Sequence, residues 1–329
     1  MRAITVYEKG TAAAEDLEGL GALKPGLTRI RVKYAGVGFA DAMAVRGGYP
    51  LAPKRPFSPG YEFLGRVEGS GDPEIAAGTR VAGMIPSMGA YRELIDVEPC
   101  FVVPVPPGLC DETAALLPLN YITALAMIER CARLERGRSF LIHGAAGGVG
   151  TAALELARVL GLRAFGSASK AKHELIASLG GIPLSREGGA WIDELKALEG
   201  GGVDAAFDAF GAASFRKSWR SLSRGGTLVC YGMSPSIDGG YADFVAGLLY
   251  IAARKAFGRR RRVAICGAPA IIRGDPAWYR ASMARILGWA ESGALKPSLA
   301  GIVPWDRISD AHRRLAEGSI RGKLLLDFS

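Results

Sequence analysis

The spacing of apolar residues along the chain changes character near residue 110. Before that point, apolar and charged positions alternate at residues 27–34, and 63–68, 80–85, 91–97 and 101–103 are further short strand-like runs. A period of two is typical of half-buried β-strands. We therefore expect the first hundred residues to form a β-rich unit punctuated by Gly and Pro.

From residue 112 onward, helical spacing alternates with short apolar runs. Helices are expected at 112–117, 122–129, 152–160, 243–257, 278–292 and 308–317. Strands are expected at 140–143, 164–166, 203–208, 227–231, 263–267 and 323–327. Alternation of strands and helices predicts a parallel sheet covered on both faces.

Composition sets limits on the class of protein. The 329 residues are enough for two domains, and a hydrophobic content of 49% supports large buried cores. The five cysteines are scattered and form no CxxC pair, which favours a reducing cytoplasm. We expect no signal peptide and no membrane span, because the chain opens on a strand-like segment and carries no apolar run of the necessary length.

The net charge of +9 is concentrated in Arg254, Lys255 and the arginines at 259–262. No nucleic-acid-binding motif accompanies it, so we expect no nucleic-acid partner. The plain interpretation is a solvated helix end. The alternatives are an anionic membrane surface, an acidic partner or a phosphate-bearing substrate.

Residues 143–150 (HGAAGGVG) lie between an apolar strand and a helical segment. A strand, a glycine turn and a helix form a dinucleotide site, because the backbone can approach a pyrophosphate and the helix offers free N–H groups. The fingerprint has alanine in its first position. The candidate cofactor-binding residues here are Ala145, Ala146, Gly147, Gly148, Val149 and Gly150; an ordinary tight turn is the alternative.

The segment after the next strand indicates which nucleotide would bind. NAD sites usually place an acidic residue there, whereas this chain has Ser167, Ser169, Lys170 and Lys172 and no carboxylate. Hydroxyls and cations suit a 2′-phosphate, which favours NADPH. Arg186, after the third strand, could stack on adenine or bind the same phosphate. The alternative is that the lysines simply begin a solvated helix.

Motifs spread over nearly the whole chain resemble the medium-chain dehydrogenase/reductase superfamily. The sequence looks most like the zinc-independent quinone oxidoreductases and, within them, the vesicle amine transport protein-like members. The motifs are 34–41 (YAGVGFAD), 46–50 (RGGYP), 59–62 (PGYE), 120–124 (NYITA), 143–150, 166–173 (GSASKAKH), 202–204 (GVD) with Asp208, 231–233 (YGM) and 322–325 (GKLL).

The resemblance implies a two-domain architecture of the α/β class. A GroES-like, β-rich catalytic domain at 1–120 and 266–329 would be split around a Rossmann domain at 121–265, which has a doubly wound parallel sheet. It also implies NADPH as the cofactor and usually a homodimer.

The same resemblance implies roles for individual residues. Tyr49 matches a tyrosine that lines the active site and is the first candidate for a proton donor or hydrogen-bonding group; Tyr61 is the second. The alternative for Tyr49 is a packing role, and Asp41 is best interpreted as a structural turn carboxylate. Asn120 and Thr123 would lie near the nicotinamide. The remaining implied cofactor-binding residues are Phe210, Tyr231, Gly232 and Lys323.

The residues also argue against a zinc site. Zinc alcohol dehydrogenases carry a Cys in the segment that matches 36–41 and a His where this chain has Tyr61. The three histidines, His143, His173 and His312, lack ligand spacing. Hydride transfer would then need an acceptor that is already electrophilic, such as a quinone or an α,β-unsaturated carbonyl.

Two departures concern the substrate side. Gly38 stands where quinone reductases usually have Asn, and Met43 stands where some have a second tyrosine. We therefore keep three hypotheses: an NADPH-dependent reductase of quinones or enones, an enoyl reductase acting on a carrier-linked or coenzyme A thioester, and an NADPH-binding protein that associates with a membrane or partner through residues 244–262.

Overall fold

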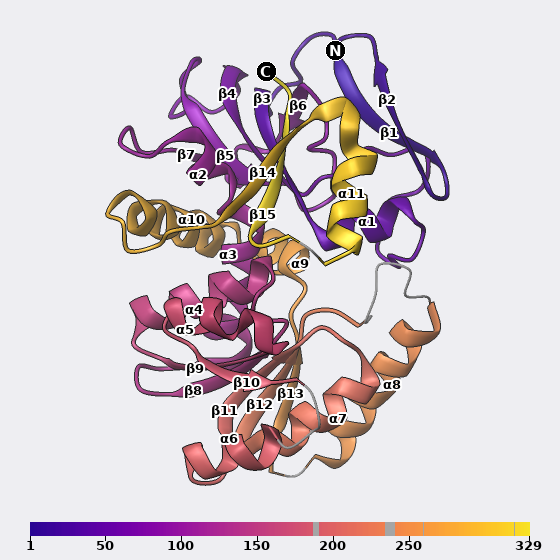
Figure 1. The fold of residues 1–329 in the computed structure, drawn as a ribbon. Coiled ribbons are helices and arrows are strands. Elements are labelled where there is room, and N and C mark those ends of the chain that lie inside the picture. Colours follow the sequence, from indigo (N-terminus) through magenta and orange to yellow (C-terminus); the bar gives the residue numbers. More distant parts are fainter. Residues whose placement is uncertain (187–190, 234–240, 259, 319) are drawn as a thin grey trace. The chain divides into compact units, whose positions relative to one another are not determined.

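The computed structural model describes residues 1–186, 191–233, 241–258, 260–318 and 320–329 and is drawn in Figure 1. The chain forms two compact units. Unit 1 comprises residues 1–122 and 268–329, and unit 2 comprises residues 123–267. The chain passes from unit 1 to unit 2 after residue 122 and returns after residue 267. Each boundary lies two residues beyond the predicted boundary, at 120 and 265 respectively. The predicted fold class, a β-rich unit with a doubly wound parallel-sheet unit, is confirmed.

Unit 1 is built on two sheets. Strands β1 (Arg2–Glu8) and β2 (Thr11–Asp16) form an antiparallel pair. The larger sheet has the order β14-β15-β3-β4-β5-β7, and β6 also pairs with β3. Its strands are β3 (Thr28–Val37), β4 (Glu62–Ser70), β5 (Arg80–Met84), β6 (Leu94–Val97), β7 (Val102–Pro104), β14 (Leu299–Pro304) and β15 (Lys323–Asp327).

The helices of unit 1 come from both ends of the sequence. They are α1 (Phe39–Val45), α2 (Asp111–Ala115), α3 (Pro118–Leu125), α9 (Ala268–Gly274), α10 (Pro276–Glu291) and α11 (Ile308–Ala316), with short 3-10 turns η1 (Pro99–Phe101) and η4 (Trp305–Arg307). Helix α3 runs across the boundary into unit 2. Buried Tyr279 fixes α10, because its hydroxyl accepts from Met84 N at 2.8 Å and donates to Phe101 O at 3.3 Å.

Unit 2 contains a parallel sheet with the order β10-β9-β8-β11-β12-β13. The strands are β8 (Ser139–His143), β9 (Arg163–Ala168), β10 (Ile182–Ser185), β11 (Val203–Asp208), β12 (Leu222–Cys230) and β13 (Arg262–Ile265). The chain progresses outward in one direction from β8 to β10 and in the other from β11 to β13. Ligands of such sheets bind at the carboxyl ends of the strands where this direction reverses.

Helices connect these strands. They are α4 (Gly148–Leu160), α5 (His173–Ser178), α6 (Trp191–Glu199), α7 (Ala212–Ser221) and α8 (Tyr241–Phe257), with a π-helical turn η2 (Ala126–Ala132) and a 3-10 turn η3 (Lys170–Lys172). Helix α4 packs on β9, α7 packs on β11 and β12, and α8 packs on β13 (Figure 1). Phe165, Phe215 and Leu228 are fully buried between these layers.

Most expected elements are present, with a few differences. The helix predicted at 122–129 is the end of α3 followed by the π-helical turn, which stops at Arg133 in a left-handed conformation. Strands β2 and β14 and helices α1, α5, α6, α7 and α9 were not predicted, because each is too short to show a clear period. No helix in the described part of the chain combines the length and apolarity needed to span a bilayer.

Candidate active site

The glycine turn lies at the point of the sheet where its strand order reverses. It follows β8 and leads into α4, whose N-cap is Gly147. Gly144 has a φ of +67°, which favours glycine. A Cβ on Gly150 would overlap the carbonyl oxygen of Gly144. Small residues are therefore required for the turn itself, and they leave the first N–H groups of a thirteen-residue helix without intrahelical acceptors.

The segment after β9 divides the predicted phosphate-binding residues into two groups. Lys170 is exposed, and Ser169 and Lys172 are partly exposed around turn η3. Arg186 is also exposed and is brought close to this segment, because its backbone N–H donates to Ala168 O at 3.0 Å. Ser167 differs: it is 1% exposed. Its hydroxyl therefore serves the interior of unit 2, contrary to the expectation that it would face a phosphate.

The hydroxyl of Ser167 belongs to a buried polar network beneath the glycine turn. His143 Nδ1 lies 2.6 Å from Ser167 Oγ, and His143 Nε2 lies 2.9 Å from Ser218 Oγ. Ser218 donates to Asp208 Oδ2 at 2.5 Å. Burial lowers the pKa of His143, against the opposing effect of the Asp208 carboxylate. The network ties β8, β9, β11 and α7 together directly below the turn.

Three further predicted cofactor residues lie around the same edge. The ring of Phe210 lies beside Gly144, where an added Cβ would be 3.3 Å from Cζ of the ring. Tyr231 donates its hydroxyl to His143 O at 3.4 Å. Gly232 follows directly and is partly exposed. The structure therefore brings the glycine turn, Phe210, Tyr231 and Gly232 together.

In unit 1, the two predicted tyrosines are hydrogen-bonded to each other. Tyr61 donates its hydroxyl to Tyr49 Oη at 3.2 Å. Tyr61 is 4% exposed, whereas Tyr49 is partly exposed in the loop after α1. Burial raises the pKa of both phenols, so both hydroxyls stay protonated at neutral pH. The pair can donate a hydrogen bond, or a proton, from Tyr49 while Tyr61 supports it.

Asp41 holds the backbone around this pair. Its carboxylate accepts from Gly38 N at 2.9 Å, from Gly60 N at 3.2 Å and from the Tyr91 hydroxyl at 3.2 Å. The Asp41 side chain is fully buried, and burial raises its pKa to about 7. Asp41 therefore joins the start of α1 to the turn that precedes Tyr61, consistent with its interpretation as a structural carboxylate.

Lys323 was predicted to contact the cofactor, but the structure gives it a different partner. Its ammonium is 4% exposed and pairs with the carboxylate of Glu62 on β4. Glu62 also accepts from Leu119 N at 2.8 Å, at the start of α3. The ion pair therefore anchors the helix that carries Asn120 and Thr123, of which the first is partly exposed and the second 8% exposed.

Comparisons with known proteins agree with this architecture. Residues 24–107 match the family model of the alcohol dehydrogenase GroES-like domain, and residues 186–326 match that of the zinc-binding dehydrogenases. The human synaptic vesicle membrane protein VAT-1 homolog is 31% identical over 313 residues, which cover 92% of this chain and 79% of that protein. Mouse quinone oxidoreductase-like protein 2 is 30% identical, with coverage of 92% and 85%.

The chain belongs to the medium-chain dehydrogenase/reductase superfamily. A solved mycobacterial member in complex with NADPH superposes on it with a TM-score of 0.83 at 26% identity, covering 99% of this chain and 100% of that one. Membership makes this protein an oxidoreductase of the superfamily with a nicotinamide-dinucleotide site. It confirms the resemblance found in the sequence.

One of the two matching family models is described as zinc-binding, which makes the partners of Tyr61 and Glu62 relevant. Within the described ranges, no three His, Cys, Asp or Glu side chains are arranged to hold a metal. Tyr61 is bonded to Tyr49, and Glu62 is neutralised by Lys323. The hydroxyl of Tyr61 and the carboxylate of Glu62 therefore each have a partner within unit 1.

Sequence reasoning missed the partners of these residues. Glu62 and Lys323 each stand directly before an apolar run at the start of a strand, and a charge that is buried there needs a partner. The sequence therefore indicated that each charge needs a partner, but it could not identify that partner. Tyr91, which holds Asp41, was visible only as a strand residue.

Proposed function

We propose that this protein is a zinc-independent, NADPH-dependent reductase that transfers hydride to a quinone or to the activated C=C bond of an α,β-unsaturated carbonyl. The observation that carries the proposal is the hydrogen-bonded pair Tyr61–Tyr49, at 3.2 Å. It provides two protonated hydroxyls, one of them from Tyr61, which stands where zinc-dependent relatives have a His ligand. Such a pair suits an acceptor that needs a proton and no Lewis acid.

NADPH is the cofactor that the residues of unit 2 support. The small residues from Gly144 to Gly150 would admit the pyrophosphate against the start of α4. Ser169, Lys170 and Lys172 would bind the 2′-phosphate, with Arg186 nearby. When bound, the cofactor supplies the hydride. The solved relative that contains NADPH supports the same choice.

The residues of unit 1 would supply the hydrogen bond or proton that the substrate needs after hydride transfer. Tyr49 would donate a hydrogen bond to the acceptor oxygen, and Tyr61 would hold the Tyr49 hydroxyl in place. Because burial raises both pKa values, neither phenol would act as a base at neutral pH. Asp41 and the Glu62–Lys323 pair would keep the backbone around Tyr61 and Asn120 rigid.

The substrate class is tested by following NADPH oxidation with a panel of a simple quinone, a simple enone and an enoyl thioester. We expect turnover with the quinone or the enone. Turnover with the thioester alone would instead support the enoyl reductase on a carrier- or coenzyme A-linked substrate. Absence of turnover with all three would reject the catalytic proposal and leave the NADPH-binding, partner-associated alternative.

The tyrosine pair is tested by removing one hydroxyl at a time. Tyr49→Phe should lower kcat about a hundredfold, the usual size of a lost general acid, whereas Tyr61→Phe should cost roughly tenfold because it removes only support. Tyr7→Phe is the matched control, since that hydroxyl is on an exposed residue and bonds to Glu15. An unchanged kcat in Tyr49→Phe would reject the role of the pair.

The nucleotide preference is tested with Lys172→Ala, compared with Lys196→Ala on α6. We expect the first variant to weaken NADPH binding at least tenfold and to leave NADH binding nearly unchanged, because only NADPH carries the 2′-phosphate. Equal losses for the two nucleotides would contradict the assignment.

A homodimer and a cytoplasmic location also belong to this proposal. Family resemblance supports the homodimer. The five scattered cysteines, which are free thiols, support the cytoplasmic location.

A further inference from the structure

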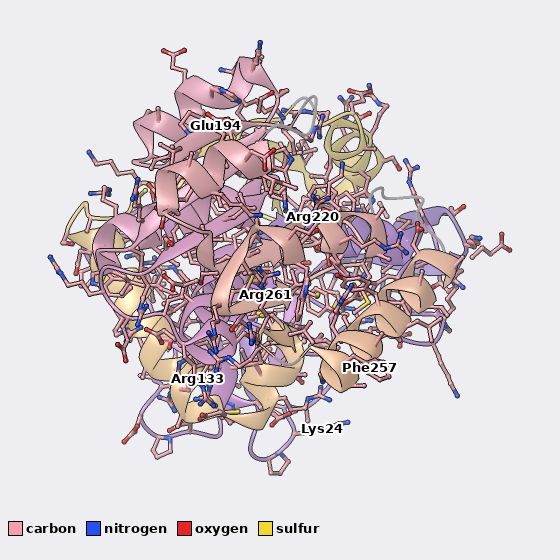
Figure 2. The ribbon with its side chains drawn as sticks, turned by 90° about the horizontal axis from the view of Figure 1, so that it is seen from below. Lys24, Arg133, Glu194, Arg220, Phe257 and Arg261 are labelled. Carbon is pink, nitrogen blue, oxygen red and sulfur yellow. The ribbon has the colours of Figure 1, made fainter. Side chains whose placement is uncertain are left out.

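The opposite end of the parallel sheet in unit 2 carries a cavity that the proposed reaction does not use. The cavity has a volume of about 660 Å³ and is lined by Arg224, Gly225, Gly258, Arg260, Arg261 and Arg262. These residues lie at the amino ends of β12 and β13, whereas the glycine turn lies at the carboxyl ends of the strands. Figure 2 views the molecule from this side, with Arg220, Phe257 and Arg261 labelled.

The cavity is formed by an irregularity in β12. Val203 pairs with Leu222, but Ala205 pairs with Thr227, so the residues between Leu222 and Thr227 bulge from the ladder. Gly225, with a φ of +88°, lies in this bulge and donates its N–H to Arg260 O at 2.7 Å. The bulge is therefore bonded to the segment that enters β13, and both sides of the cavity are fixed.

Arg261 has a structural role within this cavity. Its guanidinium donates to three carbonyl oxygens where α7 passes into β12: Trp219 O at 2.7 Å, Leu222 O at 2.5 Å and Ser223 O at 3.3 Å. Burial lowers the pKa of this arginine. The side chain satisfies carbonyls that would otherwise repel an anion, and it holds the backbone between Arg260 and Arg262.

The other three arginines that line the cavity do not have the structural hydrogen bonds of Arg261. Arg224, Arg260 and Arg262 are exposed, and none of their side chains forms a hydrogen bond or ion pair with a described residue. No Asp or Glu is among the lining residues. Three like charges that line one cavity without an acidic neighbour favour an anion there. Arg259, which belongs to the same sequence run, lies outside the described residues.

We propose that this cavity is a second binding site, separate from the cofactor edge, for a phosphate-bearing polyanion. Guanidinium groups match the geometry of phosphate oxygens and bind them in a bidentate manner. The nine-residue strand β12 separates the cavity from the carboxyl edge by on the order of 20 Å, so one small ligand cannot occupy both.

The test titrates the full chain with inorganic pyrophosphate by calorimetry at low and at moderate salt. We expect saturable binding that weakens as salt rises, because the three arginines are exposed. The variant Arg224→Gln/Arg260→Gln/Arg262→Gln should lose at least tenfold in affinity. The control variant Lys24→Gln/Arg273→Gln/Arg307→Gln removes the same charge from exposed positions of unit 1 and should bind as the parent does.

A third variant separates this site from the cofactor site. Lys170→Gln/Lys172→Gln should keep the pyrophosphate affinity of the cavity and lose NADPH affinity, whereas the triple arginine variant should show the reverse. Absence of saturable binding, or equal losses in the arginine and control variants, would overturn the proposal. So would pyrophosphate binding that disappears in the lysine variant only. Far-UV circular dichroism checks that each variant is folded.

A second arm identifies the source of the phosphate. Co-sedimentation is measured with phosphatidylcholine vesicles that contain about 5% phosphatidylinositol bisphosphate. Binding that requires the three arginines and is displaced by pyrophosphate would support a lipid headgroup as the ligand. Pyrophosphate binding without vesicle binding would support a soluble phosphate compound. Neither result depends on catalytic turnover, so the site stands or falls independently of the proposed reaction.

Discussion

Lys323 and Glu62 form an ion pair inside unit 1, where their side chains are 4% and 0% exposed. The two residues begin strands β15 and β4, which flank β3 in the sheet. Gly36 on β3 passes between them, since a Cβ there would overlap the Glu62 carboxylate. Loss of one partner would therefore leave a buried charge without its counter-ion.

We expect Lys323→Met to lower the free energy of unfolding by about 3–5 kcal/mol, the usual cost of breaking a buried ion pair. The double variant Lys323→Met/Glu62→Gln should recover much of this loss, because the unpaired carboxylate is also removed. Urea denaturation monitored by circular dichroism measures both effects. A single variant within about 1 kcal/mol of the parent would show that the pair does not hold unit 1 together.

Asp41 should make the protein less stable as the pH rises. Its pKa is about 7 in the folded state and near 3.8 when unfolded, so the folded state holds this proton more tightly. The stabilisation is fully present below pH 3.8 and is lost as the pH rises through 7; it amounts to on the order of 4 kcal/mol. Asp41→Asn should remove this dependence between about pH 4 and pH 8.

The measurement compares unfolding free energies of the parent and of Asp41→Asn at several pH values. Carboxylates whose pKa is lowered, such as Glu93 and Asp111, contribute the opposite slope in both proteins and therefore cancel in the difference. The difference should grow with pH in favour of the variant. Parallel curves would mean that Asp41 stays ionised throughout this range.

Sequence patterns predicted the central strands of unit 2, β8, β9, β11 and β12, because these strands are largely buried. The run at 203–208 was predicted residue for residue as β11, since its apolar residues Val203 and 205–207 are those of a buried central strand. The glycine turn was also recognisable, because its chemistry is local. Short helices were missed in both units (α1, α5, α6, α7 and α9), since they hold too few turns to show a clear period.

Pairings between distant residues could not be predicted. Ser167 is followed by lysines and looked like a phosphate ligand. In the structure, strand register places it opposite His143, and its hydroxyl is used there. Lys323 likewise looked available for a cofactor until the sheet brought Glu62 to it. Both outcomes depend on register and strand order, which are properties of the folded sheet and not of any local pattern.

The glycine turn offers a substitution with a matched control. Gly150→Ala would place a methyl group against the carbonyl of Gly144, so the turn must shift. We expect a loss of about 1–3 kcal/mol in stability and weaker NADPH binding. Gly288→Ala lies inside α10 with no atom near the added methyl group, and it should stabilise the protein by up to about 1 kcal/mol. Similar effects at both positions would refute the close-packed turn.

Cys131 should be the more reactive thiol of a contacting pair. The Cys266 thiol is hydrogen-bonded to it and lowers its pKa, with a further contribution from the positive charge of Arg130. Because the thiolate is the nucleophile, Cys266→Ala should raise the pKa of Cys131 and slow its alkylation near neutral pH. Iodoacetamide labelling across a pH series, read by mass spectrometry, gives the midpoint for each cysteine. Cys110 is exposed and bonds only to Thr113 among the contacts described for its thiol, so it serves as the internal control with the same rate in both proteins. If the pH midpoint of Cys131 labelling does not rise in Cys266→Ala, the Cys266 thiol does not lower the pKa of Cys131.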